Sequence, residues 1–434
     1  MTSARAPFDT SARAGSPVAA PEQRRAVRGG ALGNYVDQFD IMLPVVTLAP
    51  VADRVLGAQH AAAATGWVFA ATLLGRPLGA LLLGPVADRL GRTATTQLAL
   101  AGIALTTALV AVVPDHTVLG GWTVAVVVLL RFLGGVFVGG EYSAAIPLAM
   151  EWSAPRRRGS LSGLVMAMSP WANATISALV LVLTWLLPAG SYGAWGWRVP
   201  FLVGALLAAC LAVYYRSLVA DSPVWRQAAP RPNPLREVLV GAHRGALWQV
   251  LVLMSGLWLL TQMAVPTLTA QLRGGGRLGP QQLSLTLLVA TAGSAVAMQL
   301  AGRLSTATGR RRFFVGFAAV VVVAAPLTWA GVLAAHGVPA LVALALLLQL
   351  VTVTGYAPVG AYLAERFPAA VRASGYGVGY SLSLVVPALY PLWLPALQHV
   401  LGRAAVPAVL VTGGLLLGAG AWRGPEPDVD APLT

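Results

Sequence analysis

Five ionisable side chains stand deep inside long apolar stretches of this sequence. Asp37 and Asp40 lie three residues apart in "NYVDQFDIM", so they would share one face of a helix. Arg76 in "LLGRPLG", Arg131 in "LLRFLGG" and Glu141 after "FVGG" have equally apolar neighbours. An ionisable group at the centre of an apolar layer costs about 2.5 kcal/mol or more, and it usually faces a partner or a water-filled passage. The pattern predicts charge pairing, proton exchange or recognition of a charged ligand.

Each of these groups has a functional and a purely structural interpretation. Asp37 or Asp40 could bind and release a proton near neutral pH, or could form a permanent pair with a buried arginine. Arg76 and Arg131 need counter-charges, and a guanidinium fork suits a carboxylate, which points towards an organic acid as ligand. Both arginines could instead only hold helices together. We expect Arg76 with Asp37 or Asp40 to be the core pair, and Glu141 to be a coupling residue.

Uncharged residues complete the predicted ligand site. A polar or aromatic side chain inside an apolar run can contact a ligand, although packing is the more common role. The candidates are Asn34 and Tyr35 in the first run and Gln262 and Tyr356 in the second half of the chain, with Trp258 as a stacking wall.

A short polar link, "GPVADRLGR", separates two of the apolar stretches. It contains Gly84, Asp88, Arg89, Gly91 and Arg92. The glycines allow a tight turn. The carboxylate and guanidiniums can form charge-assisted hydrogen bonds and interact with exposed helix ends. If the partner helix end belongs to the other half of the chain, the link latches one face of the protein shut. The alternative is that the arginines only anchor the topology.

Two sequence patterns of the first half recur in the second half. Glu151 precedes Arg158 by seven residues in "EWSAPRRR", and Glu365 precedes Arg372 by seven in "ERFPAAVR". The link at Gly84 has a counterpart, "GRLSTATGRRR", and the two repeats have offsets of 218 and 214 residues. Duplication of a helical unit is typical of transporters with a central binding site. We expect Glu151 with Arg158, and Glu365 with Arg372, to be gate charges on the cytoplasmic face.

The amino-acid composition is typical of a chain that folds in a membrane rather than in water. Of its 434 residues, 57% are hydrophobic and 10% are charged, whereas soluble domains carry about 25% charged residues. The net charge is +14, but all 29 basic residues are arginines that fall in short clusters between apolar runs. That pattern is typical of membrane topology signals and argues against a nucleic-acid partner.

The residue types needed for cofactor or metal chemistry are scarce. The one cysteine, Cys210, cannot form a disulfide framework or a cysteine metal site, and the five histidines do not cluster. No GxxxxGK[ST] loop is present, so ATP-driven pumping has no visible machinery. We therefore expect no cofactor, no metal and no enzymatic activity.

Twelve apolar runs are long enough to cross a bilayer of about 30 Å as helices. Their length and lack of alternation exclude a β-barrel. We predict an all-α membrane protein with twelve transmembrane helices. The runs are 30–52, 62–86, 93–113, 118–145, 159–187, 197–215, 246–270, 282–303, 312–335, 339–363, 371–396 and 403–422.

Arginine placement gives the orientation and the domain organisation. With the N-terminus inside, 22 arginines fall in cytoplasmic segments and 5 in outer ones, which predicts cytoplasmic termini in the cell membrane. The predicted parts are a disordered N-terminus (1–28), a six-helix bundle (29–215), a Pro-rich cytoplasmic linker (216–244), a second six-helix bundle (245–423) and a cytoplasmic tail (424–434).

These motifs resemble the major facilitator superfamily over nearly the whole membrane domain. The link at 84–92 is similar to its Gly-x-x-x-Asp-Arg-x-Gly-Arg signature. Several stretches resemble its metabolite:proton symporter family, which takes up carboxylates and zwitterionic osmolytes. They are "LGNYVDQFDI", "GRPLGALLLG", "RFLGGVFVGGEY", "GWRVPF" and "ADSPVW". The resemblance implies two pseudo-symmetric bundles that rock about a central site under an ion gradient. The second copy of the link departs from the pattern, because Thr306 stands where an aspartate is expected.

We therefore predict a secondary active transporter that works by alternating access. It would carry a small carboxylate or zwitterionic metabolite together with protons, as a monomer in the lipid bilayer. The alternative with the same fold is a proton-driven exporter, an antiporter of a drug or secreted small molecule.

Overall fold

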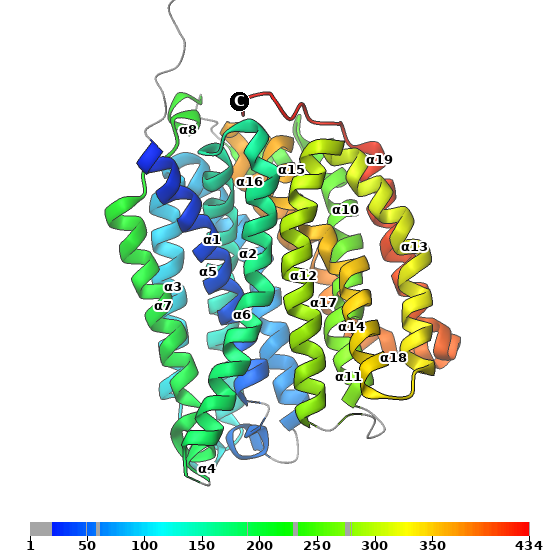
Figure 1. The fold of residues 1–434 in the computed structure, drawn as a ribbon. Helices are drawn as coiled ribbons and strands as arrows, with labels where there is room; N and C mark the ends of the chain where they lie inside the picture. Colours follow the sequence, from blue (N-terminus) through cyan, green and yellow to red (C-terminus); the bar gives the residue numbers. More distant parts are fainter. Residues whose placement is uncertain are drawn as a thin grey trace, which may run out of the picture.

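Every regular element in the described part of the chain is helical. The computed structural model describes residues 20–48, 50–57, 61–188, 190–228, 233–273, 278 and 280–433. Figure 1 shows long helices running side by side along a common direction. A helix satisfies its backbone N–H and C=O groups internally, as an apolar surrounding demands. The prediction of an all-α fold is confirmed.

The first half of the chain forms one bundle, coloured blue to green in Figure 1. Within it, α2 packs along α5 and α3 packs along α7. The long helices are α1 (Ala20–Leu48), α2 (Ala61–Leu90), α3 (Arg92–Val112), α5 (Trp122–Glu151), α6 (Arg158–Leu186) and α7 (Arg198–Leu218). The short turns are η1 (Asp53–Gly57), α4 (His116–Leu119), η2 (Pro155–Arg157) and η3 (Tyr192–Gly196).

The second half forms the other bundle, after two short linker helices, α8 (Pro223–Gln227) and α9 (Pro234–Leu239). Several of its helices are interrupted by tighter or wider turns. Its elements are α10 (Arg244–Gln262), η4 (Met263–Thr267), α11 (Leu268–Arg273), α12 (Pro280–Thr308), α13 (Arg310–Ala334), α14 (Val338–Thr352), η6 (Val353–Tyr356), α15 (Val359–Arg366), η7 (Ala369–Val371), α16 (Arg372–Leu382), α17 (Val385–Ala388), α18 (Tyr390–Leu401), η8 (Gly402–Ala404) and α19 (Ala405–Arg423).

All twelve predicted runs coincide with helical segments. Ten helical stretches in the described chain are long and apolar enough to span a membrane. The other two predicted runs correspond to α1 and to the segment α16–α18, which breaks between Leu382 and Val385 and again at Leu389. Helix α1 begins at Ala20, so residues 20–28 are helical rather than disordered as predicted; residues 1–19 lie outside the described part.

The outer surface of the paired bundles is apolar. Large side chains such as Trp122, Leu181, Trp185, Leu206 and Leu327 are mostly exposed on it. Monomeric soluble proteins rarely expose apolar patches of this extent. The surface therefore fits the hydrocarbon region of a bilayer, with the polar groups kept inside the protein.

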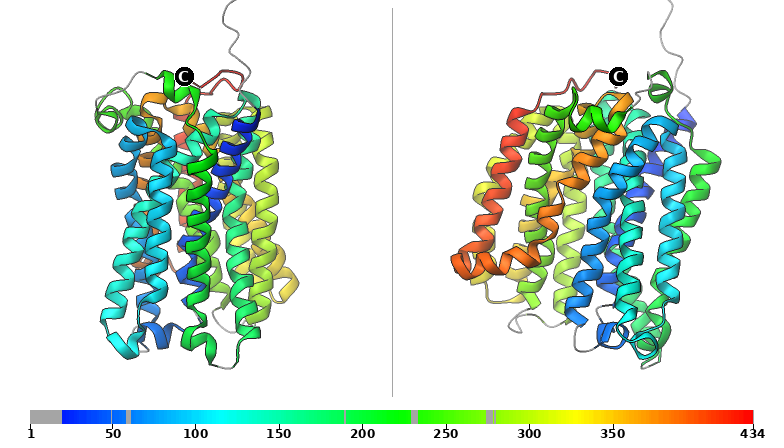
Figure 2. Two further views of the ribbon diagram at one scale, coloured as in Figure 1. Left: turned by 90° about the vertical axis from the view of Figure 1, so that its left-hand side faces the viewer. Right: turned by 180° about the vertical axis from the view of Figure 1, so that it is seen from behind.

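The two bundles meet along two seams. Helix α6 packs against α12, and α2 packs against α16, as the views in Figure 2 also indicate. The first seam depends on a close backbone approach: a Cβ on Gly302 would lie 2.4 Å from the carbonyl oxygen of Gly159. At one end of the molecule, where α2, α5 and α12 end, the C-terminal segment runs from α19 towards the first bundle. We call this end, which contains Arg92, Arg158, Arg310 and Arg372, the Arg-rich face.

Candidate functional site

The approach of α2 to α5 brings charged side chains of both helices into the interior. A Cβ on Gly139 would lie 2.2 Å from the carbonyl oxygen of Arg76, so only glycine permits this spacing. Arg76 and Glu141 therefore come from adjacent, closely packed turns. Their side chains are buried, with 1% and 0% exposure. Asp37, from the facing side of α1, is also fully buried.

Asp37 and Glu141 form a pair of adjacent carboxyl groups. A Cβ on Gly33, one turn before Asp37 on α1, would clash with Oε1 of Glu141, so the Glu141 carboxyl points at α1 beside Asp37, and both carboxyl groups interact electrostatically with Arg76. None of the four carboxyl oxygens accepts a hydrogen bond from an N–H or O–H group of the described residues. Two neighbouring carboxyl groups shielded from water cannot both be ionised at low cost, so the arrangement favours a proton held between them.

Arg76 lies among aromatic rings from both bundles. Its guanidinium carbon is 5.3 Å from the ring centre of Tyr142, 5.9 Å from that of Trp258 and 5.4 Å from that of Tyr380. Nε and Nη2 of Arg76 have no hydrogen-bond partner in the described part of the chain. Buried donors without partners are costly, and a guanidinium with two such donors has the chemistry to bind an anionic group.

Stacking across the seam joins the aromatic residues. The rings of Tyr142, on α5, and Tyr380, on α16, stack with 4.1 Å between their centres. Trp258 on α10 contacts Tyr380 and Tyr356 edge-on, at 5.2 Å and 5.4 Å, and its Nε1–H donates to the carbonyl oxygen of Tyr380. The predicted candidates Trp258 and Tyr356 thus belong to the central cluster.

Asp40 is paired with Arg131 rather than Arg76. Arg131 donates two hydrogen bonds to the Asp40 carboxylate, at 2.9 Å and 2.7 Å, and one to its carbonyl oxygen at 2.8 Å. Thr107 donates to the same carboxylate, and Arg131 also donates to Thr72. Of the two partners predicted for Arg76, Asp40 is wrong, whereas Asp37 interacts electrostatically with Arg76. The position of a residue along a helix does not reveal which neighbouring helix its side chain faces. In the structure, the side chain of Arg131 faces Asp40.

The remaining uncharged candidates lie at different places. Asn34 is fully buried between α1 and α6, where its Nδ2 donates to Val165 and weakly to Ser169. Tyr35 is half-buried, with its ring centre 6.1 Å from that of Phe39. Gln262 is buried in the second bundle and donates to the carbonyl oxygen of Pro387 at 3.4 Å. The structure therefore brings Asp37, Arg76, Glu141 and Tyr356 into one region. Asn34, Tyr35 and Gln262 lie at the margins of this region.

On the Arg-rich face, Asp88 binds a helix end of the other bundle. Its carboxylate accepts hydrogen bonds from the backbone N–H groups of Ala373 and Ser374, each at 2.9 Å. These groups belong to the first turn of α16, where the helix dipole favours a negative charge. Gly84, which lies within α2 rather than in a turn, permits the contact, since its Cβ would come 3.1 Å from the Ser374 Cα.

Other residues of the link have different surroundings. Gly91 directly precedes α3 and has a φ of 111°, a backbone conformation that suits glycine. Arg92 is fully buried, whereas Arg89 is exposed at the end of α2. The linker also reaches this corner: Asp221 accepts from the N–H of Thr93, and the Trp225 indole donates to the carbonyl oxygen of Asp88.

The repeated glutamates pair with arginines across the bundles. Glu151 lies 2.7 Å from Arg372 and 3.0 Å from Arg92, and it also accepts from Ser222. All four residues expected as gate charges, Glu151, Arg158, Glu365 and Arg372, lie at this face, and they pair crosswise between the two halves. Each motif glutamate faces the motif arginine of the other half.

Glu365 is the counterpart in the second bundle. It accepts two hydrogen bonds from Arg310, both at 3.2 Å, and lies 4.0 Å from Arg158. Thr306, which replaces the expected aspartate, accepts a hydrogen bond from Arg310 and lies against Gly159 at the start of α6. The carboxylate contact to a helix start is thus made in one direction only.

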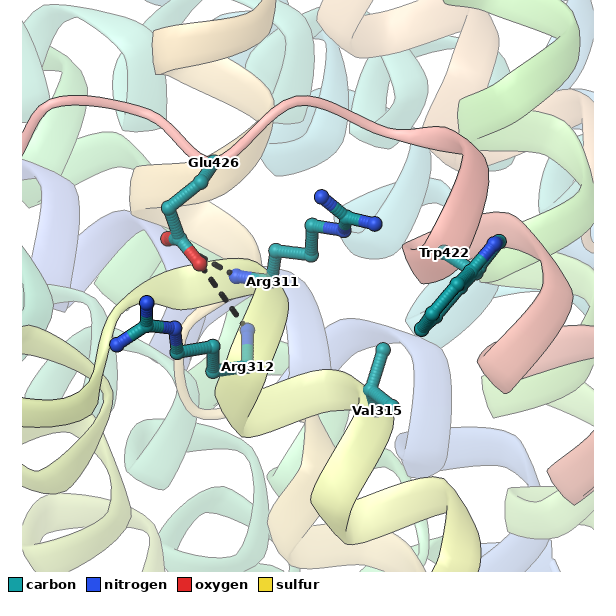
Figure 3. A pocket seen from close by; sticks show the side chains of 5 residues that line it. All are labelled: Arg311, Arg312, Val315, Trp422 and Glu426. Carbon is teal, nitrogen blue, oxygen red and sulfur yellow. Dashed lines mark hydrogen bonds between the residues drawn. The ribbon is translucent and has the colours of Figure 1, made fainter.

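A C-terminal strap, residues 424–433, extends from α19 across the Arg-rich face. Glu426 accepts hydrogen bonds from the backbone N–H groups of Arg311 and Arg312 at the start of α13, as Figure 3 shows. Further along, Asp430 pairs with Arg156 of the first bundle. The hydrogen bond from Arg156 lowers the pKa of Asp430. The strap therefore links the two bundles.

Three contributors to this face are absent from the predicted site: Arg310, Ser222 and the strap. Arg310 had a signal, since "Gly309-Arg310" repeats "Gly91-Arg92" at the offset of the links. Ser222 lies in the stretch "ADSPVW" that carries part of the family resemblance, but its role at this face was not predicted, and the strap carries no recognisable motif. Among the described residues, no group of three His, Cys, Asp or Glu side chains could hold a metal ion.

Comparison with known proteins places these features in a family. The sequence model of the Major Facilitator Superfamily matches residues 31–279. The inner membrane metabolite transport protein YhjE of Escherichia coli is 30% identical over 348 residues, covering 78% of each chain. A citrate-proton symporter of Klebsiella pneumoniae is 28% identical over 388 residues, covering 85% of each. The structure of the proton:xylose symporter XylE has the same fold, with a TM-score of 0.72 and 16% identity over 92% of this chain and 94% of that one.

Proposed function

The chain belongs to the major facilitator superfamily and is a multi-pass membrane transporter rather than an enzyme, and from this premise we propose that it imports a small carboxylate or zwitterionic metabolite together with protons. The Asp37–Glu141 pair carries the proton. Arg76 binds the carboxylate of the substrate, and the aromatic rings around it contact the rest of the molecule. The Asp40–Arg131 pair holds α1 against α5.

The single observation that carries this proposal is the position of the unsatisfied charges. Asp37, Arg76 and Glu141 are buried, lack hydrogen-bond partners for most of their polar atoms, and lie beside aromatic residues of the second bundle. A structural ion pair would be fully satisfied, as Asp40–Arg131 is. Buried polar atoms left without partners at a bundle interface suit groups that exchange protons and ligands during a cycle.

The Arg-rich face supports alternating access. In the described chain, all ion pairs that join the two bundles lie at this face, between Glu151 and Arg372, Glu365 and Arg158, and Asp430 and Arg156. We assign this face to the cytoplasm of the cell, where the excess of arginine belongs. The conformation is then closed to the cytoplasm, and import requires these contacts to break.

The test uses purified protein in liposomes with a pH gradient. A thermal-shift screen with gluconate, quinate, citrate, proline and glycine betaine first identifies a bound compound, because a ligand of the folded state stabilises it. A symporter then concentrates that compound in an alkaline lumen, whichever way the protein is inserted. An exporter that exchanges substrate for protons concentrates it in an acidic lumen instead, and that result would contradict the proposed direction. Protein-free liposomes control for passive entry.

A further inference from the structure

The charges of the central cluster determine how many protons accompany the substrate. Arg131 is saturated by Asp40, so Arg76 is the one cation in the described part of the cluster that a ligand can use. Asp37 and Glu141 are the carboxyl groups beside it. This inference depends on the proposed function, since it assigns a substrate class and stoichiometry to the same site.

In the empty site, the net charge is zero when the Asp37–Glu141 pair holds one proton. The pair then carries one negative charge, which offsets the positive charge of Arg76. Both carboxyl groups and the guanidinium are at most 1% exposed, so a net charge here would be poorly solvated. The other charged or titratable groups around the pair are the Asp40 carboxylate, already neutralised by Arg131, and the hydroxyls of Tyr215, Tyr376 and Tyr380.

Adding a ligand changes this balance in a way that depends on its charge. A monocarboxylate bound to Arg76 adds one negative charge, which a second proton on the Asp37–Glu141 pair cancels. A zwitterion adds no charge, so a second proton would leave the site positive. A tricarboxylate adds three negative charges, and Arg76 alone among the described residues of the cluster is available to neutralise them. Of these classes, only the monocarboxylate keeps both the empty and the loaded site neutral while a proton is bound and released.

We propose that the protein carries a monocarboxylate and one proton together, electroneutrally, with Arg76 binding the carboxylate and the Asp37–Glu141 pair taking up the second of its two protons. The faces of Tyr142, Trp258 and Tyr380 lie around Arg76 and contact the uncharged body of the substrate. The same cluster disfavours citrate-like polyanions, because no second free cation is available to them among the described residues.

The experiment measures flux of gluconate and quinate into liposomes at a fixed pH gradient, with the membrane potential set by potassium and valinomycin. Gluconate and quinate are monocarboxylates whose hydroxyl groups slow passive entry. We expect one proton per anion, from a pH dye in the lumen, and the same accumulation at zero and at about −100 mV. One net charge per cycle would instead change the accumulation ratio about fiftyfold at that potential.

Variants separate the roles of the two charged groups. In Asp37→Asn/Glu141→Gln, the anion should still bind Arg76, but proton movement should cease and flux should become dependent on potential. In Arg76→Gln, the thermal shift with gluconate should disappear, and Arg76→Lys should restore part of it. Both variants should retain the elution profile of the folded protein.

The outcomes distinguish this inference from the function on which it rests. Absence of pH-driven flux of every probe contradicts the proposed function and the inference together. Flux that is driven by the pH gradient but changes about fiftyfold with potential, or that accepts glycine betaine or citrate and rejects both monocarboxylates, contradicts the inference alone.

Discussion

Glu151→Gln should open the Arg-rich face. The Glu151 carboxylate lies 2.7 Å from Arg372 of the other bundle and 3.0 Å from Arg92 of its own, and all three side chains are buried. The substitution keeps the size of the side chain and removes its charge. The contact with Arg92 lies within one bundle, so it need not change when the bundles separate. The contact with Arg372 exists only while the bundles are closed.

The magnitude follows from the contact that differs between the two states. A hydrogen bond to a charged partner contributes about 1.5–3 kcal/mol, and each 1.4 kcal/mol is a factor of ten in an equilibrium. The ratio of closed to open protein should therefore fall about ten- to a hundredfold. Because the buried Arg372 loses the carboxylate that lies 2.7 Å from it when the face is closed, the upper part of this range is expected.

Distance measurement between spin labels tests this expectation. Cysteines at Ser217 and Ala307, exposed near the ends of α7 and α12, report the separation of the bundles once Cys210 is replaced by alanine. Glu151→Gln should add a longer-distance population. Glu22→Gln, which removes an exposed carboxylate at the start of α1, should leave the distribution unchanged. An unaltered distribution in a folded Glu151→Gln protein would refute the reasoning.

The other predictions concern the latch, the buried ion pair and the strap. Asp88→Asn should lower uptake about tenfold at equal surface expression, because an amide oxygen replaces a charged acceptor at the start of α16; normal uptake would contradict this. Arg131→Met should destabilise the protein by about 3–5 kcal/mol in a denaturant titration, and adding Asp40→Asn should recover part of the loss; a double variant less stable than the single one would argue against the pairing. Asp430→Asn should speed tryptic removal of the strap several-fold. Because the pKa of Asp430 is lowered, acidification of the wild type should mimic this variant only below the ordinary titration range of aspartate; equal cleavage of variant and wild type would show that the strap is not held by this contact.

The sequence predicted the helices well, because an apolar run of twenty or more residues has few alternatives in a membrane. It was less informative where helices are short or broken. In the run 371–396, Pro391 marks the start of α18 after the break at Leu389, but no proline or glycine marks the break at Ser383 between α16 and α17. Helix α1 begins before its apolar stretch, since polar residues such as Glu22 and Arg24 can extend a helix out of the membrane.

The charged residues of the site could be chosen from sequence, but their partners could not. The positions of Asp40 and Arg131 inside long apolar runs indicated that both are buried. Their pairing depends on how α1 and α5 are rotated about their own axes. The recurring spacing of Glu151 to Arg158 and of Glu365 to Arg372 predicted charges at one face, but it did not reveal which glutamate meets which arginine. The observed pairing of Glu151 with Arg372 arises from the packing of two similar halves, which places equivalent motifs opposite one another.

The proposed transport cycle requires a proton held by Asp37 and Glu141, and a comparison of substrate counterflow with pH-driven accumulation tests this requirement most directly. In liposomes with an alkaline lumen, the wild-type protein should concentrate its substrate, and Asp37→Asn/Glu141→Gln should exchange labelled for unlabelled substrate at a comparable rate without concentrating it. A double variant that still concentrates substrate under the pH gradient would contradict the account, and Asp40 would then be the carboxylate to test next.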